Sequence, residues 1–294
     1  MLGLKPVDSD VSKRLHRGAL QVRDFTHQWG SRTLIMGIVN VTPDSFSGDG
    51  VLNCADAVER ARTHAEAGAD IIDIGGQSTR PGYAPVSAEE ELKRVLPVLT
   101  ELRAQMPSAL VSLDTTKPEV LRAASQADIL NSIWGLSDQL LDIAVERSLP
   151  VVIMHNKERA EYAAGVVDEM LRYLDEQARK AVRAGLKHEH VILDPGIGFG
   201  KTAEHNLQVL NQLHRLTALG FPTLLGTSRK SFLGKLTGKT VDQRLFGSLA
   251  TVSLAVAAGV DIVRVHDVAQ TGDALAVSDA IVRQVRPSGW RSDV

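Results

Sequence analysis

The sequence predicts an α/β fold in a single domain, a (β/α)8 TIM barrel. Short apolar runs rich in β-branched residues recur along the chain, and each is followed by a longer segment with helical periodicity. This unit occurs eight times, and its runs are mostly apolar rather than alternating, as in parallel strands covered on both faces. The length of 294 residues also suits one barrel of this class.

The eight expected strands follow one another from about residue 34 to residue 265. They are residues 34–39, 71–74, 110–113, 129–130, 151–154, 191–193, 223–225 and 262–265. The expected helices are residues 55–66, 88–102, 118–125, 140–147, 166–184, 204–219, 243–257 and 272–283. Several of them are followed by a glycine, which adopts the left-handed conformation at a helix end without strain. Strict alternation implies a parallel sheet, and eight units favour a closed barrel over the alternative, an open doubly wound sheet.

Around the barrel, expected at residues 33–285, we predict a polar lead-in at residues 1–32 with room for one early strand, and a tail at residues 286–294. The sequence has no run of about 18 apolar residues and no signal-peptide pattern, so no membrane span is expected. The formal net charge of -2 argues against nucleic-acid binding by bulk attraction. The single cysteine, Cys54, cannot form an internal disulfide, which fits a cytoplasmic protein.

Polar residues follow nearly every expected strand, where this fold places its active site. A buried polar group left without a partner costs roughly 1–3 kcal/mol, so such a ring makes sense if a polar ligand supplies the partners. Single members have simpler interpretations: Asp73 could be a core-edge carboxylate paired to backbone, and His266 a structural histidine. As a set they predict an active site.

Two segments rich in Gly, Ser and Thr follow the first two strands, at residues 42–50 and 75–85. Their composition suits covers that close over a substrate and exclude water. The alternative is ordinary surface loop, which glycine and serine most often form.

The segment DPGIGFGK at residues 194–201 resembles a phosphate-binding loop in composition but not in spacing. The P-loop pattern would need a glycine at position 195, where Pro195 stands, and the dinucleotide-binding pattern would need one at Lys201. The segment also follows the sixth strand rather than the first. We therefore reject both nucleotide-binding interpretations and read its glycines as room for close approach of a ligand.

Five strings at strand ends together resemble the dihydropteroate synthase family: NVTPDSFS, GGQSTRPG, DPGIGFGKTAEHN, SRKSFLG and RVHDV, in the family's order from about residue 34 to residue 283. The resemblance implies condensation of 7,8-dihydropterin-6-ylmethyl pyrophosphate with p-aminobenzoate in folate biosynthesis. It also implies substantial loss of pyrophosphate before the amine attacks, with the cationic pterin stabilised electrostatically and no covalent enzyme intermediate.

The resemblance assigns residues to each part of the site. It implies a pterin pocket of Asp114, Asn131, Asp194 and Lys230, with Asp114, Lys230 and Arg264 as catalytic residues. Amide and carboxylate groups at fixed positions can read the donor and acceptor edge of a pterin. Pyrophosphate is expected at Asn40, Arg264 and His266, with Mg²⁺ held by Asn40. The p-aminobenzoate pocket is expected to use Thr79, Arg80, Pro81, Phe199 and Ser228.

The chain departs from the family pattern at several places. Among them, Asp49 is offset by one place, Gln77 replaces a usual Glu, and Ser132 replaces a common Asp. These three departures support one alternative, a pterin-binding paralogue without synthase activity. A second alternative is a methyltransferase that uses methyltetrahydrofolate, which would keep the pterin pocket but needs no p-aminobenzoate loop. The STRPG and SRKS strings favour the synthase over the methyltransferase. The resemblance also implies a homodimer through late helices, and residues 248–255 are a small and apolar stretch that could pack in this way or face the barrel.

Overall fold

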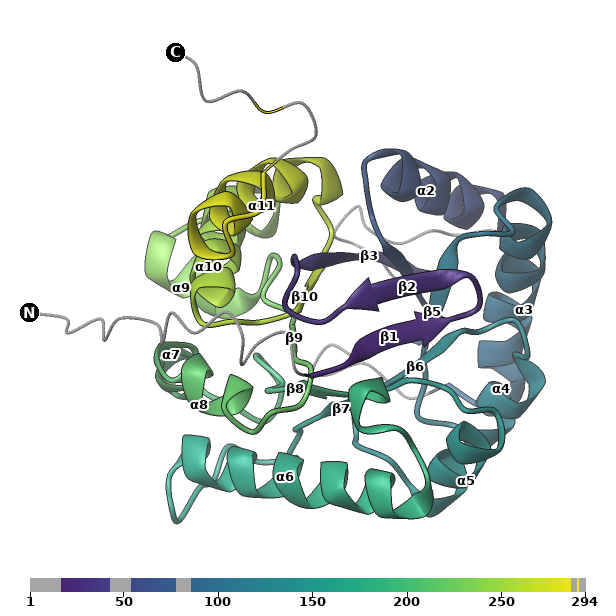
Figure 1. Cartoon of the computed structure of the whole chain (residues 1–294), viewed down its shortest axis with the longest axis horizontal. Helices are drawn as coiled ribbons and strands as arrows, with labels where there is room; N and C mark the ends of the chain where they lie inside the picture. Colours follow the sequence, from purple (N-terminus) through teal and green to yellow (C-terminus); the bar gives the residue numbers. More distant parts are fainter. Residues whose placement is uncertain (1–16, 43–53, 78–85, 287–289, 291–294) are drawn as a thin grey trace, which may run out of the picture.

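The computed structural model describes residues 17–42, 54–77, 86–286 and 290 (Figure 1). Its strands are β1 (Ala19–Val22), β2 (Phe25–Gln28), β3 (Leu34–Asn40), β4 (Ile71–Gly75), β5 (Leu110–Asp114), β6 (Ile129–Ser132), β7 (Val151–Met154), β8 (Val191–Asp194), β9 (Leu224–Leu225) and β10 (Ile262–Val265). Its α-helices are α2 (Cys54–Glu66), α3 (Ala88–Gln105), α4 (Pro118–Ala123), α5 (Asp138–Glu146), α6 (Val166–Ala184), α7 (Ala203–Asn211), α8 (Leu213–Thr217), α9 (Ser231–Thr237), α10 (Leu245–Ala257) and α11 (Val268–Val282), with 3-10 turns at His188–His190 and Val241–Gln243.

Eight parallel strands form a closed barrel, which confirms the predicted fold class. Their order is β8-β7-β6-β5-β4-β3-β10-β9. A parallel bridge between Leu193 and Thr223 joins the two ends, so β8 meets β9. The helices stand in a ring around the strands (Figure 1). All eight expected strands are present, with bounds that agree to within two residues.

The structure differs from the expected helices chiefly in four places. The helix expected at residues 272–283 begins four residues earlier, as α11 at Val268. The helix expected at residues 204–219 is broken at Gln212 into α7 and α8. The helix expected at residues 243–257 begins at Leu245 after a 3-10 turn. The short α9 was not expected, because its central Gly234 lowers the helical signal. These differences lie on the outside of the barrel and leave the strand ends in place.

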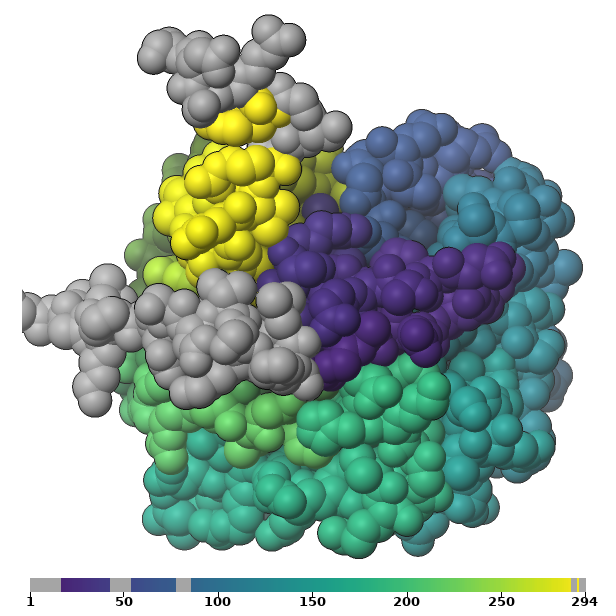
Figure 2. All heavy atoms as spheres, viewed as in Figure 1, coloured from purple at the N-terminus to yellow at the C-terminus, as the bar shows by residue number. Residues whose placement is uncertain are grey.

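A β-hairpin of β1 and β2 covers the N-terminal opening of the barrel, where we expected at most one strand (Figures 1 and 2). Leu20, Val22 and Trp29 pack there against the first inward residues of the barrel strands, such as Leu34 and Ile262. The Trp29 indole N–H donates to a backbone carbonyl next to β8, at 2.9 Å. Burying these side chains closes the barrel at this end and leaves the opposite end for the site.

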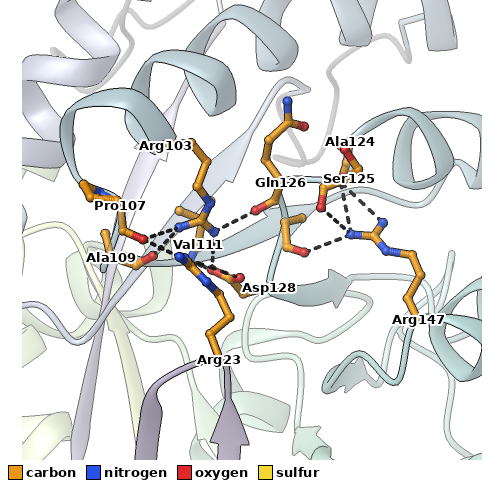
Figure 3. A network of polar contacts seen from close by, with 11 residues as sticks. Arg23, Arg103, Pro107, Ala109, Val111, Ala124, Ser125, Gln126, Asp128 and Arg147 are labelled. Carbon is orange, nitrogen blue, oxygen red and sulfur yellow. Dashed lines mark hydrogen bonds and ion pairs between the residues drawn. The ribbon is translucent and has the colours of Figure 1, made fainter.

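Arginines brace the same end around Asp128, beside a cleft of about 630 Å³ (Figure 3). Arg103 donates to a carboxylate oxygen of Asp128 and to the carbonyl of Ala109 at 2.7 Å. Arg147 donates to carbonyls at the end of α4, including that of Leu121 at 2.9 Å. The terminal N–H groups of Arg103 and Arg147 thus bond to acceptors of the protein itself. We therefore interpret the cluster as structural support for the loops.

Among the described residues, no helix is long and apolar enough to cross a membrane.

Candidate active site

The interior of the barrel changes from apolar to polar along its strands, because side chains two residues apart point to the same face. In β6 the inward Ile129 is followed by Asn131, and in β8 the inward Ile192 is followed by Asp194. The apolar residues form the core above the hairpin, and the polar residues lie at the C-terminal ends. The inward polar side chains are Asn40, Asp73, Ser112, Asp114, Asn131, Asp194 and Arg264.

Arg264 lies between two buried carboxylates and joins three strands, β10, β4 and β5. Its Nε donates to Asp73 Oδ2 at 2.7 Å, and its Nη2 lies 2.6 Å from the same oxygen. The same Nη2 donates to Asp114 Oδ2 at 3.1 Å. Asn131 Nδ2 reaches both oxygens of Asp73, at 3.3 and 3.4 Å. Three of the predicted site residues therefore meet around Asp73. Its carboxylate bonds to side chains, and not to backbone as in the simpler interpretation of this residue.

Asp194 and Lys230 place opposite charges at the same mouth, close enough for each to influence the pKa of the other. Asp194 Oδ1 accepts from the backbone N–H of Gly196 at 2.7 Å, which fixes the plane of its carboxylate. Lys230 donates to the carbonyl of Ile197, and its Nζ lies 4.7 Å from the centre of the Phe199 ring. The structure thus brings together Asp194 and Lys230, expected in the pterin pocket, and Phe199, expected in the p-aminobenzoate pocket.

Burial favours the neutral form of three of these groups and shifts the pKa of each accordingly. It raises the pKa of Asp114 to about 7, a shift that Arg264 opposes and Asp73 increases. Burial also raises the pKa of Asp194, against the attraction of Lys230. It lowers the pKa of Lys230 to about 8, and here Asp194 opposes the shift. Such shifts are common where a site waits for a polar partner.

The DPGIGFGK segment is held against the loop after β7 by Lys201 and by its glycines. Lys201 Nζ donates to His155 Nδ1 at 2.9 Å and to carbonyls of the segment itself, that of Gly196 at 3.0 Å. A Cβ on Gly196 would lie 1.9 Å from the His155 carbonyl oxygen, and one on Gly200 2.3 Å from the Lys157 carbonyl oxygen. These two glycines therefore allow backbone to approach backbone, and not a ligand as we had expected.

The turn before Lys230 is fixed on several sides. Arg229 adopts a φ of +57°, which costs energy for a residue with a side chain. Its guanidinium pairs with Asp267 at 2.6 Å, and its backbone N–H donates to Ser248 Oγ at 3.0 Å. Ser228 Oγ accepts from the His266 backbone N–H at 3.2 Å and lies 3.0 Å from Nδ1 of that ring. Two residues predicted for different subsites, Ser228 and His266, thus contact each other.

Three predicted p-aminobenzoate residues, Thr79, Arg80 and Pro81, lie outside the described residues, as does Asp49. Gln77 is described, and its Oε1 accepts from Lys117 Nζ at 2.6 Å.

Ser132, another departure from the family pattern, is fully buried, and its Oγ donates to the Gly135 carbonyl at 2.5 Å. This hydrogen bond therefore stabilises the loop that follows β6.

Two side-chain oxygens lie near Gly75, at the C-terminal end of β4. Oδ1 of Asn40 and Oδ2 of Asp114 lie 3.7 and 3.8 Å from the point that a Cβ on Gly75 would occupy. Oxygen donors of this kind are the ligands that Mg²⁺ prefers. Within the described part of the chain, no group of three His, Cys, Asp or Glu side chains could hold a metal. Any magnesium here would need oxygens from a ligand or from water as well.

Sequence comparison places this site in a known family. A family profile described as pterin binding enzyme matches residues 36–266. The dihydropteroate synthase of Clostridium beijerinckii is 44% identical over 87% of this chain and 96% of its own length. That of Escherichia coli K12 is 45% identical over 84% of this chain and 90% of its own. The chain belongs to the dihydropteroate synthase family.

Solved structures of dihydropteroate synthases share the fold. The enzyme of Xanthomonas albilineans with 4-aminobenzoic acid is 45% identical, with a TM-score of 0.81 over 87% of this chain and 94% of that one. A structure of that enzyme with 7,8-dihydropteroate has a TM-score of 0.76 and 42% identity over the same shares. The Clostridium difficile enzyme with pteroic acid is 42% identical, with a TM-score of 0.81 over 85% of this chain and 97% of that one.

Proposed function

We propose that this chain is a dihydropteroate synthase that condenses 7,8-dihydropterin-6-ylmethyl pyrophosphate with p-aminobenzoate, giving 7,8-dihydropteroate and pyrophosphate. The observation that carries the proposal is the convergence of Asp114, Asn131, Asp194 and Lys230, all from different strand ends, on one mouth of the barrel. Relatives of this name are 43–45% identical over most of the chain.

The four side chains offer acceptors and one donor in fixed directions. Asp194 has one oxygen on the Gly196 N–H, which leaves the other for an amino or ring N–H group of a pterin. Asn131 directs Nδ2 at Asp73, so its Oδ1 is free to accept as well. Lys230 can donate to a ring oxygen or nitrogen. The edge of a pterin carries both donors and acceptors, which can pair with these side chains. A ring that lacked such groups would leave the buried side chains without hydrogen-bond partners.

Pyrophosphate would be held by Asn40, Arg264 and His266. Arg264 has already committed Nε and Nη2 to carboxylates, so its Nη1 is the donor left for an oxygen anion. Mg²⁺ held by Asn40 would supply positive charge to the leaving group when it is bound. Asn40 would contribute one oxygen ligand. Magnesium usually keeps several ligands from water and substrate, in agreement with a single protein side chain.

The reaction breaks the C–O bond to pyrophosphate and forms a C–N bond to the arylamine. Positive charge grows on the pterin methylene as the C–O bond breaks. Asp114, buried beside Arg264, is well placed to stabilise that charge electrostatically. No residue needs to form a covalent bond to the substrate.

The p-aminobenzoate pocket would be formed by Thr79, Arg80, Pro81, Phe199 and Ser228. Lys230 lies over the face of the Phe199 ring, so this ring would form an aromatic wall next to the residues proposed to bind the pterin. Ser228 lies against His266, so the amine subsite would border the pyrophosphate subsite. This adjacency suits a reaction in which the amine replaces the pyrophosphate at one carbon.

A homodimer in the cytoplasm is the assembly we propose. On α10 the side chains at 246, 250 and 254, spaced four residues apart, are exposed and apolar, with Phe246 82% and Leu254 61% exposed. Val277 and Ile281 of α11, which packs beside α10, are exposed as well. The opposite face of α10, including Ser248 and Ala255, packs inward. An exposed apolar stripe of this kind commonly marks a protein interface.

One assay separates the synthase from the two alternatives. Purified protein is mixed with Mg²⁺, the pterin pyrophosphate and labelled p-aminobenzoate, and the label should appear in dihydropteroate. Asp194→Ala should abolish pterin binding, measured by calorimetry. Pterin binding without transfer would favour the inactive paralogue, and transfer of a methyl group from methyltetrahydrofolate would favour the methyltransferase. Wild-type pterin affinity in Asp194→Ala would refute the pocket.

A further inference from the structure

Asp73 is the deepest charged residue of the site. It lies in the middle of β4, with Ile38 and Ser112 as its register partners on the neighbouring strands. Its side chain is 0% exposed, whereas Asp114 and Asp194 are 6% and 7% exposed. Asp73 therefore lies beneath the residues that face the mouth, where a ligand would not reach it.

Within the described residues, the side-chain hydrogen bonds of Asp73 all go to side chains that the pocket needs. Arg264 gives it two N–H groups on one oxygen, and Asn131 gives it one N–H that reaches both oxygens. Two N–H groups from one guanidinium fix both the position and the plane of that group. An amide whose N–H side is occupied can turn only its oxygen toward the mouth. The carboxylate therefore determines which atom Asn131 presents.

We propose that Asp73 is a positioning residue of the pterin and pyrophosphate subsites, which orients the Arg264 guanidinium and the Asn131 amide without touching substrate. The proposal rests on the function proposed above, since it needs Arg264 and Asn131 to be in contact with ligand. It adds a residue that couples the two subsites through one carboxylate.

A role in stability alone accounts poorly for this residue. Desolvating a carboxylate and a guanidinium is expensive, and replacing such a buried pair by apolar residues is often neutral or stabilising. Ile38 stands at the same level of the barrel, so an apolar side chain fits this layer. A charge at position 73 is explained if it sets the direction of groups that act on the substrate.

The test uses Asp73→Asn, which keeps the size and an acceptor for Asn131 but removes the charge that holds Arg264. We expect kcat/KM for the pterin pyrophosphate to fall about 100-fold, as misplacement of a positioned group can cause. The Kd of 6-hydroxymethylpterin, measured by calorimetry, should rise less, and the KM of p-aminobenzoate should stay within about twofold because that subsite does not depend on Arg264. An unchanged kcat/KM for the pterin ester would overturn the proposal.

A matched control is Asp279→Asn. Asp279 is also buried and also pairs with an arginine, Arg283 at 2.8 Å, but on the outside of the barrel. This variant should lose stability and keep wild-type kinetics. A loss of kcat/KM equal to that of Asp73→Asn would show a general effect of removing a buried charge and would refute a positioning role.

The Arg264→Gln variant provides a second background for Asp73→Asn. The double variant leaves no buried arginine without a partner, so it can be used if Asp73→Asn alone does not fold. If Asp73 acts through Arg264, adding Asp73→Asn to Arg264→Gln should change kcat/KM by less than about threefold. A further large loss would contradict the proposal. Failure of the proposed function would look different, since the wild-type protein would then form no dihydropteroate or Asp194→Ala would bind pterin normally.

Discussion

Gly196→Ala tests whether the DPGIGFGK segment is a rigid support. Gly196 has a φ of +68°, and the added Cβ would lie 1.9 Å from the carbonyl oxygen of His155. That oxygen belongs to backbone at the end of β7, so it cannot turn away as a flexible side chain would. Either the DPGIGFGK segment or the loop after β7 has to move.

The expected cost has two parts. An L-residue in the left-handed region costs about 1–2 kcal/mol. Forcing extra volume into a packed contact typically adds about 1–3 kcal/mol. Gly238→Ala separates them, because Gly238 has a φ of +69° and nothing within 4 Å of its Cβ position. We therefore expect Gly196→Ala to be less stable than Gly238→Ala by about 1–3 kcal/mol.

The assay is denaturant unfolding of both variants, together with steady-state kinetics. Gly196 also donates its N–H to Asp194 at 2.7 Å, so its displacement should turn that carboxylate and raise the KM for the pterin ester. Gly238→Ala should leave this KM unchanged. Equal stabilities for the two variants, or a normal KM in Gly196→Ala, would refute the idea that backbone contact at Gly196 shapes the pocket.

Four further outcomes follow from the described residues. kcat/KM should show a bell-shaped pH profile, because the acceptor Asp114 ionises above its pKa of about 7 and the donor Lys230 stays charged below its pKa of about 8; a flat profile would contradict these roles. Burial lowers the pKa of His27 to about 4, so the fold favours the neutral ring and should lose stability as pH falls from about 6.5 to 4; His27→Phe should show a shallower slope in unfolding measured against pH, and an equal slope would exclude this source. Lys201→Met should lower the free energy of unfolding by roughly 2 kcal/mol, because it strips a donor from His155 Nδ1 and several carbonyls; denaturant unfolding that matches wild type would speak against the brace. Phe246→Glu should give monomers in sedimentation velocity, and a persistent dimer would move the interface elsewhere.

The barrel could be predicted from the sequence because each strand is buried on both faces. An apolar run such as residues 191–193 then stands out from its surroundings, and its end predicts where Asp194 lies. The hairpin at the N-terminal end could not be predicted as readily. Its strands have only four residues each, and the hydrogen bond that holds the Trp29 indole goes to the Glu189 carbonyl, 160 positions away.

Asp73 was harder to interpret than Asp114, although both lie on inward positions. Asp114 follows a strand and is expected at the mouth, whereas Asp73 stands inside an apolar run. Its partners Arg264 and Asn131 come from strands that are distant in sequence, so only the closed barrel brings them together. The two-residue alternation would have placed it on the inward face once the strand bounds were known.

The described part of the site is built to hold its charges in place before a ligand arrives. Asp194 is fixed by Gly196, Lys230 by the Ile197 carbonyl, and Arg264 by Asp73, each through a bond within the protein. Groups fixed in this way need little reorganisation when positive charge develops on the pterin, which is where electrostatic catalysis gains most. Gly196 and Gly200 of the DPGIGFGK segment also help to fix these groups before a ligand binds. They contribute rigidity by letting two loops share backbone contacts, and so they help to hold Asp194 at the angle that the pterin edge requires.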